Sequence, residues 1–306
     1  MNIVYLGTPD FAVLPLKKLI ESSEYNVVAV VTNKDKPVGR KGVITPPPVK
    51  VVALEHGIPV FQYDKIRVEG VSDLKKLNPD LMVTCAFGQI LSEEILSIPK
   101  FGVINIHASL LPKYRGASPI HFALLNGEKQ TGITIMKTDI GVDTGDIIAT
   151  EVINIGEKET CGQLFDRLSS VGADLIIKTL PSIFDGTAVY KKQNDLQATY
   201  TKIFTKKDAM IDWSDSAENI YNKIRAFNPA PIAYCMLNGE PFKIFEAEIN
   251  NSQGEYGCVL NSENELIVAC GDKSISLLRV QKAGGKAMDI KDFLRGNKFS
   301  KGERFI

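Results

Sequence analysis

The chain has 306 residues, of which 44% are hydrophobic and 24% charged, and its formal net charge is zero. This composition is typical of an ordinary globular protein and excludes a disordered or fibrous one. The length exceeds that of a usual single core, so we expect two domains. The sequence contains no apolar run of membrane-spanning length and no basic leader before its first strand, so we expect a cytoplasmic protein without a membrane partner.

The first third of the chain alternates between β-branched runs and amphipathic segments. Residues 2–6 are predicted as a strand and 11–22 as a helix, joined by the turn Gly7-Thr8-Pro9-Asp10. A second strand, 27–32, leads into the long aperiodic segment 33–48, which is of the kind that is functional or disordered. The turn lacks the Gly-x-Gly-x-x-Gly pattern, and this argues against a nicotinamide oxidoreductase.

The alternation continues to residue 107 and defines the fold class. A helix is predicted from Pro48 to His56, closed by Gly57. The next predicted elements are strands at 59–61 and 80–84, helices at 71–77 and 92–97, and a buried strand at 102–107. Repeated strand–helix units imply right-handed crossovers, so we expect an α/β fold with a Rossmann-like, doubly wound, mostly parallel sheet.

The strand at 102–107 ends in two polar side chains. Asn105 and His107 are two residues apart, so both point to one face at the carboxyl edge of the sheet, where open α/β folds bind ligands. An amide can donate to a developing oxyanion and an imidazole can move a proton near neutral pH, so the pair suits acyl transfer. The alternative is that the two residues merely cap a strand.

A third candidate lies further along the chain. Predicted strands at 131–138 and 146–152 are joined by the acidic loop 139–145, whose two glycines allow a tight backbone path. That path could turn Asp143 inward, where its carboxylate could orient His107 or accept a proton through water. An exposed turn acid is the alternative.

Cysteine and histidine spacing argues against metal chemistry. The five cysteines are odd in number and never form a Cys-x-x-Cys pair, which predicts reduced thiols. Cys85 lies in an apolar run and is expected in the core. The three histidines lack a familiar ligand spacing, so we expect no metal, and both His56 and His121 are expected to be structural.

The second half of the chain predicts a separate domain. A periodic helix at 160–180 is followed by the polar, aperiodic residues 189–206, which suit an inter-domain connection. After a helix at 217–226, strands are predicted at 232–237, 242–247, 256–260, 266–269 and 274–280. Five short strands are compatible with a small OB-like β-barrel. We therefore expect a catalytic domain at 1–188, a linker at 189–206 and a barrel domain at 207–306.

Positive charge gathers in three segments although the chain as a whole is neutral. Residues 33–50 carry five Lys and Arg against one Asp, residues 189–207 also five against one, and residues 271–306 nine against four Asp and Glu. A stripe of this kind would attract a phosphate backbone in a salt-dependent way.

The motifs resemble those of a known family. Asn105-x-His107 followed by Ser109-Leu110-Leu111-Pro112, with the segment 139–146 downstream, resembles the signature of the 10-formyltetrahydrofolate-dependent formyltransferases. Within that family the closest resemblance is to the members that formylate methionyl-tRNA. Three further segments support this choice, at residues 7–11, 35–40 and 225–229, so that the resemblance spans nearly the whole chain.

The resemblance implies a reaction and a set of site residues. The formyl group of the cosubstrate 10-formyltetrahydrofolate would pass to the α-amino group of initiator methionyl-tRNA, for translation initiation, on a monomeric enzyme without metal. Asn105 and His107 would hold the oxyanion, and Asp143 would support His107 and help to relay the proton. Ser109, Leu110, Leu111 and Pro112 would line the folate side, whereas Arg40 and Lys41 would contact the tRNA.

Two alternatives stay open. The first keeps the chemistry but uses another amine, such as an amino sugar nucleotide or glycinamide ribonucleotide. The second is a non-catalytic RNA-binding protein on a Rossmann-like scaffold. Formyl transfer that disappears in His107→Ala while RNA affinity persists would exclude the second.

Overall fold

The computed structural model describes residues 1–39 and 41–306, and the chain divides into two compact units. The first unit consists of Met1–Pro119, Gln130–Asn154 and Phe165–Lys202, and the second of Ile120–Lys129, Ile155–Leu164 and Ile203–Ile306. Within the part of the chain that the structure describes, no helix has the length and apolar character needed to span a membrane.

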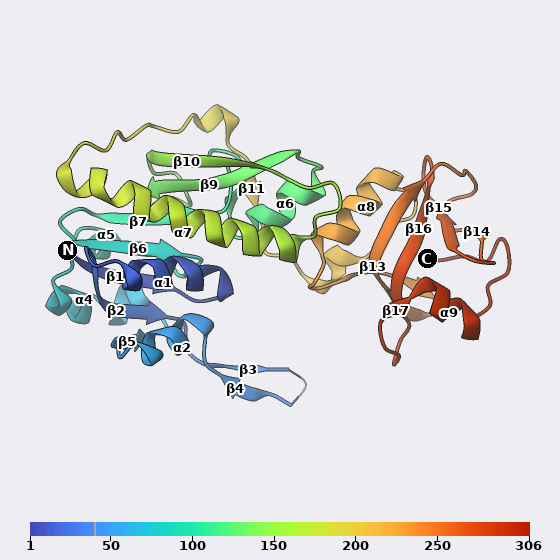
Figure 1. Ribbon diagram of the computed structural model, residues 1–306, viewed down its shortest axis with the longest axis horizontal. Helices are drawn as coiled ribbons and strands as arrows, with labels where there is room; N and C mark the ends of the chain where they lie inside the picture. The colour runs from blue at the N-terminus through green and yellow to red at the C-terminus, as the bar shows by residue number, and fades with distance from the viewer. Residues whose placement is uncertain (40) are drawn as a thin grey trace. The chain divides into compact units, whose positions relative to one another are not determined.

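A seven-stranded sheet in the order β10-β9-β7-β6-β1-β2-β5 forms the centre of the first unit (Figure 1). Its strands are β1 (Asn2–Gly7), β2 (Asn26–Thr32), β5 (Val60–Gln62), β6 (Leu81–Cys85), β7 (Val103–His107), β9 (Gln130–Lys137) and β10 (Ile147–Asn154). The strands from β5 to β7 are parallel, whereas β9 and β10 run antiparallel to their neighbours. The predicted Rossmann-like, mostly parallel sheet is confirmed, and its strand order reverses between β1 and β6.

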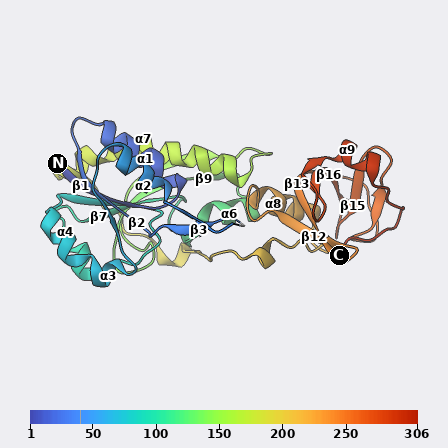
Figure 2. The ribbon, with the colours of Figure 1, turned by 90° about the horizontal axis from the view of Figure 1, so that it is seen from below.

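Helices cover both faces of this sheet. One face carries α1 (Val13–Glu21), α2 (Pro48–Glu55) and α7 (Cys161–Asp185), and the other α3 (Ile66–Glu69) and α4 (Val71–Leu77) (Figure 2). α5 (Glu93–Leu96) packs beside α4. Ile66, Leu74 and Ile95 of α3, α4 and α5 are fully buried against Val4 and Leu6 of β1. Burying each such side chain stabilises the fold by about 1.5–3 kcal/mol, so this layer fixes the sheet that carries the site.

On the first face, α7 packs against the turn that follows β1. The short 3-10 helix η1 (Asp10–Ala12) contains Phe11, whose ring centroid lies 5.1 Å from that of Phe165. The Ser169 hydroxyl donates a hydrogen bond of 2.8 Å to the Phe11 carbonyl. Phe11 is therefore a core residue that joins the first turn to α7.

The segment predicted as an aperiodic connection contains a hairpin. β3 (Lys36–Val38) pairs antiparallel with β4 (Val43–Thr45). The ammonium group of Lys50, on α2, donates 2.8 Å to Asp35 and 2.9 Å to Gln62, and so ties the base of the hairpin to the sheet. The hairpin has no core of its own, which explains why apolar periodicity did not predict it.

The second unit is built on an antiparallel, half-barrel sheet. Its strands follow the order β12 (Ala233–Leu237), β13 (Glu240–Asn250), β16 (Ser274–Gln281), β15 (Leu266–Ala269) and β14 (Val259–Asn261), with β17 (Met288–Asp289) beside β16. The helices α8 (Ala217–Ala226) and α9 (Ile290–Gly296) pack on a core that includes Trp213, Phe242 and Phe305. α6 (Pro119–Leu125) and the short 3-10 helix η3 (Lys206–Ala209) also belong here, apart from Pro119. The five predicted strands are present, whereas β17 and α9 were not predicted.

Candidate active site

The carboxyl end of β7 carries two of the predicted residues. Asn105 pairs with Thr84 of β6 on one side, and His107 pairs with Thr134 of β9 on the other. Because their side chains alternate with the buried residue Ile106, both lie on one face of the sheet. The His107 side chain is only 6% exposed, so its environment is set almost entirely by the protein.

Asp143 lies opposite this pair, on the loop between β9 and β10. Its carboxylate accepts a 3.3 Å hydrogen bond from Asn105 Nδ2 and a 2.7 Å hydrogen bond from the Gly116 amide. Asp143 Oδ2 also lies 3.6 Å from His107 Nδ1. The three residues predicted from the sequence are thus brought together, although Asp143 lies 38 positions after Asn105.

The loop reaches this position through an unusual backbone path. Asp143 itself is left-handed, with φ +52°, which costs a non-glycine residue free energy that the surrounding contacts must offset. A Cβ on Gly145 would lie 1.8 Å from the Lys137 carbonyl oxygen, so only glycine fits there. The glycine is needed for close packing against β9, and the left-handed turn falls on Asp143.

The hydrogen bonds of His107 fix which nitrogen faces the site. Nε2 lies 3.0 Å from the carbonyl oxygen of Tyr114, which can only accept. Nε2 therefore carries a proton in both the neutral and the charged imidazole. The state of Nδ1, which faces Asp143, is what changes on protonation.

Thr84 and Asp143 contact the two ends of the Asn105 amide. The Thr84 hydroxyl lies 2.9 Å from Asn105 Oδ1 and 3.2 Å from the Ile104 carbonyl. Because the Asp143 carboxylate can only accept, the amide nitrogen faces Asp143 and Oδ1 faces Thr84, and the second proton of the amide stays available for another acceptor. The sequence analysis did not single out Thr84, and its only signal was a hydroxyl near the end of an apolar strand.

Taken together, these groups can stabilise and discharge an oxyanion. Asn105 supplies an N–H donor, His107 an imidazole, and Asp143 a carboxylate 3.6 Å from His107 Nδ1. Cys85 cannot serve as a nucleophile nearby, because complete burial raises the pKa of its thiol to about 12.

The loop after β7 is held by one hydrogen bond within the loop and by one to β9. The Ser109 side chain is fully buried, and its hydroxyl donates 2.6 Å to the Lys113 carbonyl. Leu111 is also buried, and its amide donates to Thr134 Oγ1 over 3.2 Å. Leu110 and Pro112 are half-buried, so within this motif they have the more accessible side chains.

Of the two predicted tRNA contacts, only Lys41 is described by the structure. Arg40 lies outside the described residues. Lys41 is exposed, and it precedes β4 near exposed apolar side chains of Val43 and Ile44.

Part of the positive charge of residues 33–50 is neutralised by ion pairs. Lys34 pairs with Asp64, and Lys50 pairs with Asp35. The interaction with Lys50 lowers the pKa of Asp35, so that carboxylate stays charged at neutral pH. The net field of this segment is therefore weaker than its count of lysines and arginines suggests.

The other two histidines are held by packing or by a main-chain contact. His121 packs between Phe204 and Phe227, with ring centroids 5.4 and 6.1 Å away, and His56 Nδ1 lies 2.9 Å from the Val52 carbonyl. Among the described residues, no group of three or more His, Cys, Asp or Glu side chains is arranged to hold a metal ion.

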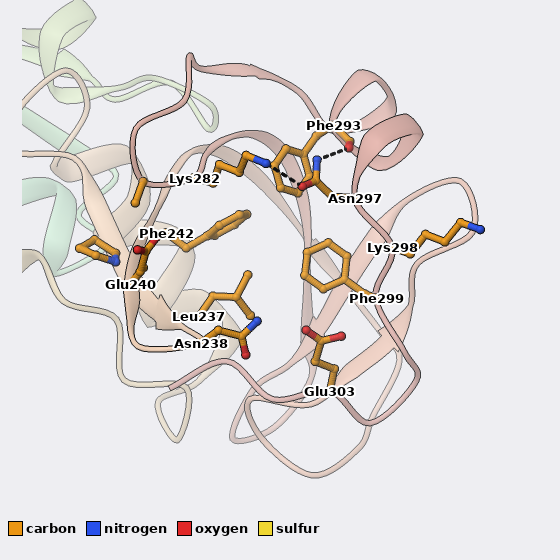
Figure 3. Close-up of a pocket in the computed structure, with 12 residues that line it drawn as sticks. Leu237, Asn238, Glu240, Phe242, Lys282, Phe293, Asn297, Lys298, Phe299 and Glu303 are labelled. Carbon is orange, nitrogen blue, oxygen red and sulfur yellow. Dashed lines mark hydrogen bonds between the residues drawn. The ribbon is translucent and has the colours of Figure 1, made fainter.

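The second unit contains a cavity of 360 Å³. Figure 3 shows Phe242 and Phe299 beside this space, with the Lys298 side chain directed outward. The lining also includes Lys282, Glu240 and Glu303, so its charged side chains cancel. None of the site residues predicted from the sequence lines this cavity.

Comparison with known proteins identifies the family. A model of the formyl transferase family matches residues 1–180, and a model of the formyl transferase C-terminal domain matches residues 203–298. The methionyl-tRNA formyltransferase of Agathobacter rectalis is 46% identical over 309 aligned positions, which cover 100% of this chain and 99% of that protein. The one from Bacillus subtilis is 47% identical and covers 96% of this chain and 94% of its own.

Solved structures share the fold at lower identity. An N-formyltransferase from Helicobacter canadensis, solved with folinic acid and dTDP-3-aminofucose, is 24% identical, with a TM-score of 0.68 over 92% of this chain and 98% of its own. A sugar 3N-formyl transferase, also 24% identical, has a TM-score of 0.67, and the match covers 94% of this chain and 99% of that protein. From the family models and the full-length relatives, the chain belongs to the formyl transferase family, in the group of the methionyl-tRNA formyltransferases.

Proposed function

We propose that this chain transfers the formyl group of 10-formyltetrahydrofolate to the α-amino group of methionine on initiator tRNA, for translation initiation. The observation that carries the proposal is the convergence of Asn105, His107 and Asp143 at one edge of the sheet. It occurs in a chain that matches methionyl-tRNA formyltransferases along its whole length.

The residues divide the work of acyl transfer. The amine attacks the formyl carbon, and the oxygen that gains charge accepts hydrogen bonds from Asn105 Nδ2 and from protonated His107. Asp143 supports the imidazolium and helps to relay the proton from the attacking amine to the leaving N10. We assign the acid and base steps to His107 and Asp143 as a pair, because the two side chains lie 3.6 Å apart.

We assign the folate side of the site to Ser109, Leu110, Leu111 and Pro112. Since the Ser109 hydroxyl is used inside its own loop, contact with the donor falls to the main chain and to Leu110 and Pro112. The buried Ser109 and Leu111 keep that loop in shape.

We assign tRNA contact to Arg40 and Lys41 and to a C-terminal domain at 207–306. The antiparallel sheet, which we take as OB-like, and the positive balance of residues 271–306 support this role. The remaining divisions are a catalytic domain at 1–188 and a linker at 189–206. We place the enzyme in the cytoplasm, where initiator tRNA is charged, as a monomer whose three catalytic residues come from one chain.

The test is formylation by the purified protein. It is incubated with 10-formyltetrahydrofolate and methionyl initiator tRNA, with free methionine, charged elongator tRNA and an amino sugar nucleotide in parallel reactions. Formyl-methionine on the initiator alone supports the proposal. Formylation of the amino sugar nucleotide instead would keep the chemistry and reject the tRNA.

Two variants separate catalysis from RNA binding. His107→Ala should abolish formyl transfer and leave the affinity for initiator tRNA unchanged. Lys41→Ala should raise the KM for tRNA but not the KM for the folate donor, since it removes a phosphate contact outside the catalytic group. If the chain were an RNA-binding protein without activity, the wild-type protein would not formylate methionyl-tRNA, and His107→Ala would have no activity to abolish.

A further inference from the structure

The chain returns to the active-site loop after α7. β11 (Tyr200–Thr201) pairs in parallel with β8 (Arg115–Gly116), and the Tyr114 amide donates 2.8 Å to the Thr199 hydroxyl. Residues 193–201, which include the 3-10 helix η2 (Asp195–Gln197), form a segment that we call the strap. The strap belongs to the first unit, and it packs on the loop that carries Tyr114 and Gly116.

The side chain of Gln193 joins this strap to the loop of Asp143. Its Nε2 donates 2.8 Å to the Asp143 carbonyl and 2.7 Å to the Gly145 carbonyl. Its Oε1 accepts 3.1 and 2.9 Å hydrogen bonds from Nε and Nη2 of Arg115. Both donors and both acceptor positions of this amide are therefore used.

These contacts allow only one orientation of the amide. A flipped Gln193 would set its oxygen against two carbonyl oxygens and its NH₂ against the guanidinium of Arg115. Arg115 is itself 1% exposed, and its Nη2 donates 2.7 Å to Asp195, so it cannot move away into solvent. The bridge is consequently rigid on both sides.

The contacts of Gln193, Asp143 and Gly116 connect to one another through Arg115, so that they surround the Asp143 carboxylate. Gln193 holds the backbone of Asp143, and the Asp143 carboxylate accepts from the Gly116 amide. Gly116 follows Arg115, whose side chain holds Gln193. The left-handed backbone of Asp143 is thus fixed at its carbonyl by one neighbour and at its carboxylate by another.

We propose that Gln193 is a positioning residue for formyl transfer, which holds the Asp143 loop so that the carboxylate stays between Asn105 and His107. Gln193 acts through Asp143 and does not touch the substrates. This inference rests on the proposed function, because it assigns Asp143 to the catalytic group. It predicts that loss of the Gln193 bridge lowers turnover and has little effect on substrate binding.

The decisive variant is Gln193→Glu. It keeps the acceptor that Arg115 needs, and it replaces both donors to the carbonyls of Asp143 and Gly145 with a repelling oxygen. Gln197→Glu is the matched control, since Gln197 is exposed in the same strap and the change in charge is identical. We expect kcat to fall about tenfold or more in Gln193→Glu, with each KM within about twofold of wild type. The control should retain wild-type kcat.

Two measurements distinguish positioning from a general loss of structure. Combined with Asp143→Asn, the change Gln193→Glu should cost no further kcat, because its effect passes through the carboxylate. The proposal would be overturned if Gln193→Glu lowered kcat by the same factor in the wild type and in Asp143→Asn. It would also be overturned if Gln193→Glu alone kept the wild-type kcat. The neutral variant Gln193→Met should show the same fall, which excludes the added charge as its cause.

Hydrogen exchange gives a readout that does not depend on activity. The amide of Gly116 donates to the Asp143 carboxylate, so its exchange should speed up about tenfold in Gln193→Glu and stay at the wild-type rate in Gln197→Glu. Unchanged exchange in Gln193→Glu would overturn the proposal even if activity fell. Absence of formyl transfer in the wild type would instead reject the proposed function, and the exchange rate of Gly116 would still show whether Gln193 holds the loop.

Discussion

The Thr84 hydroxyl lies 2.9 Å from Oδ1 of Asn105 while the amide nitrogen of Asn105 donates to Asp143, so the amide is held at both ends. The two residues sit side by side on neighbouring parallel strands. An amide rotates easily when neither end is held, so a donor aimed at a developing charge requires such a partner.

Thr84→Val should therefore lower kcat about tenfold, since the amide loses the contact that orients it while the packing volume is kept. Thr138→Val is a suitable control, because the Thr138 hydroxyl is buried without a hydrogen-bond partner among the described residues. Steady-state formylation assays with both substrates varied would compare the two variants. Equal kcat values for the variants would show that Thr84 does not orient Asn105.

Removal of the amide itself should cost more. Loss of one oxyanion donor raises the barrier by about 3 kcal/mol, so Asn105→Ala should reduce turnover about a hundredfold. Single-turnover formylation at saturating donor measures this step directly. Turnover at the wild-type rate would remove Asn105 from the mechanism.

His121 should make the stability of the protein depend on pH. Burial beside Phe204 and Phe227 lowers the pKa of His121 from its ordinary value of 6.5. As the pH falls through 6.5, the unfolded chain takes up a proton there before the folded chain does. The free energy of unfolding therefore decreases from pH 7.5 towards pH 5.5, and this contribution is fully present only above 6.5.

Urea denaturation of wild type and His121→Phe at both pH values tests this expectation. The variant keeps an aromatic ring in the cluster but cannot be protonated, so its unfolding free energy should change less between the two pH values. An identical change in both proteins would mean that other groups account for the pH dependence.

The buried cysteines should resist alkylation. Burial raises the pKa of Cys85, Cys161 and Cys270 to about 12 each, so at pH 8 only about one thiol in ten thousand is a thiolate. Iodoacetamide at pH 8 should label Cys258, which is half-buried, well before these three. Peptide mass spectrometry of native and urea-unfolded protein would locate the label. Early labelling of Cys85 would contradict its place in the core.

Regular elements with long apolar patterns could be predicted from the sequence, and short elements fixed by tertiary contacts could not. The strands of the parallel sheet and the helix α7 have such patterns, although α7 runs to Asp185, beyond the predicted end at residue 180. β8 and β11 have two residues each, and their pairing depends on a register set by distant parts of the chain. The hairpin β3–β4 is held from its base by Asp35 and Lys50, which no periodicity reveals.

The candidate site divides in the same way. The placement of Asn105 and His107 follows from strand alternation, whereas the left-handed turn that brings Asp143 inward falls on Asp143 itself and not on the neighbouring glycines that the sequence indicated. Thr84 and Gln193 were missed because the fold, not the local sequence, brings their hydrogen-bond partners near. A polar residue in a polar segment, such as Gln193, has no local feature that sets it apart from its neighbours.

During synthesis, the catalytic sheet is completed before the strap, which pairs with the active-site loop. All seven strands of the catalytic sheet have been made once residue 154 is added, whereas the partner of Tyr114 is 85 positions further along the chain than Tyr114 itself. A ribosome adds about 5–20 residues per second and domains fold as they emerge, so the sheet can form seconds before the strap leaves the exit tunnel. During that interval the nascent chain has its catalytic sheet without the hydrogen bonds from Gln193 to the Asp143 loop. On this proposal, full formyl-transfer activity requires that the chain has been extended past Thr201.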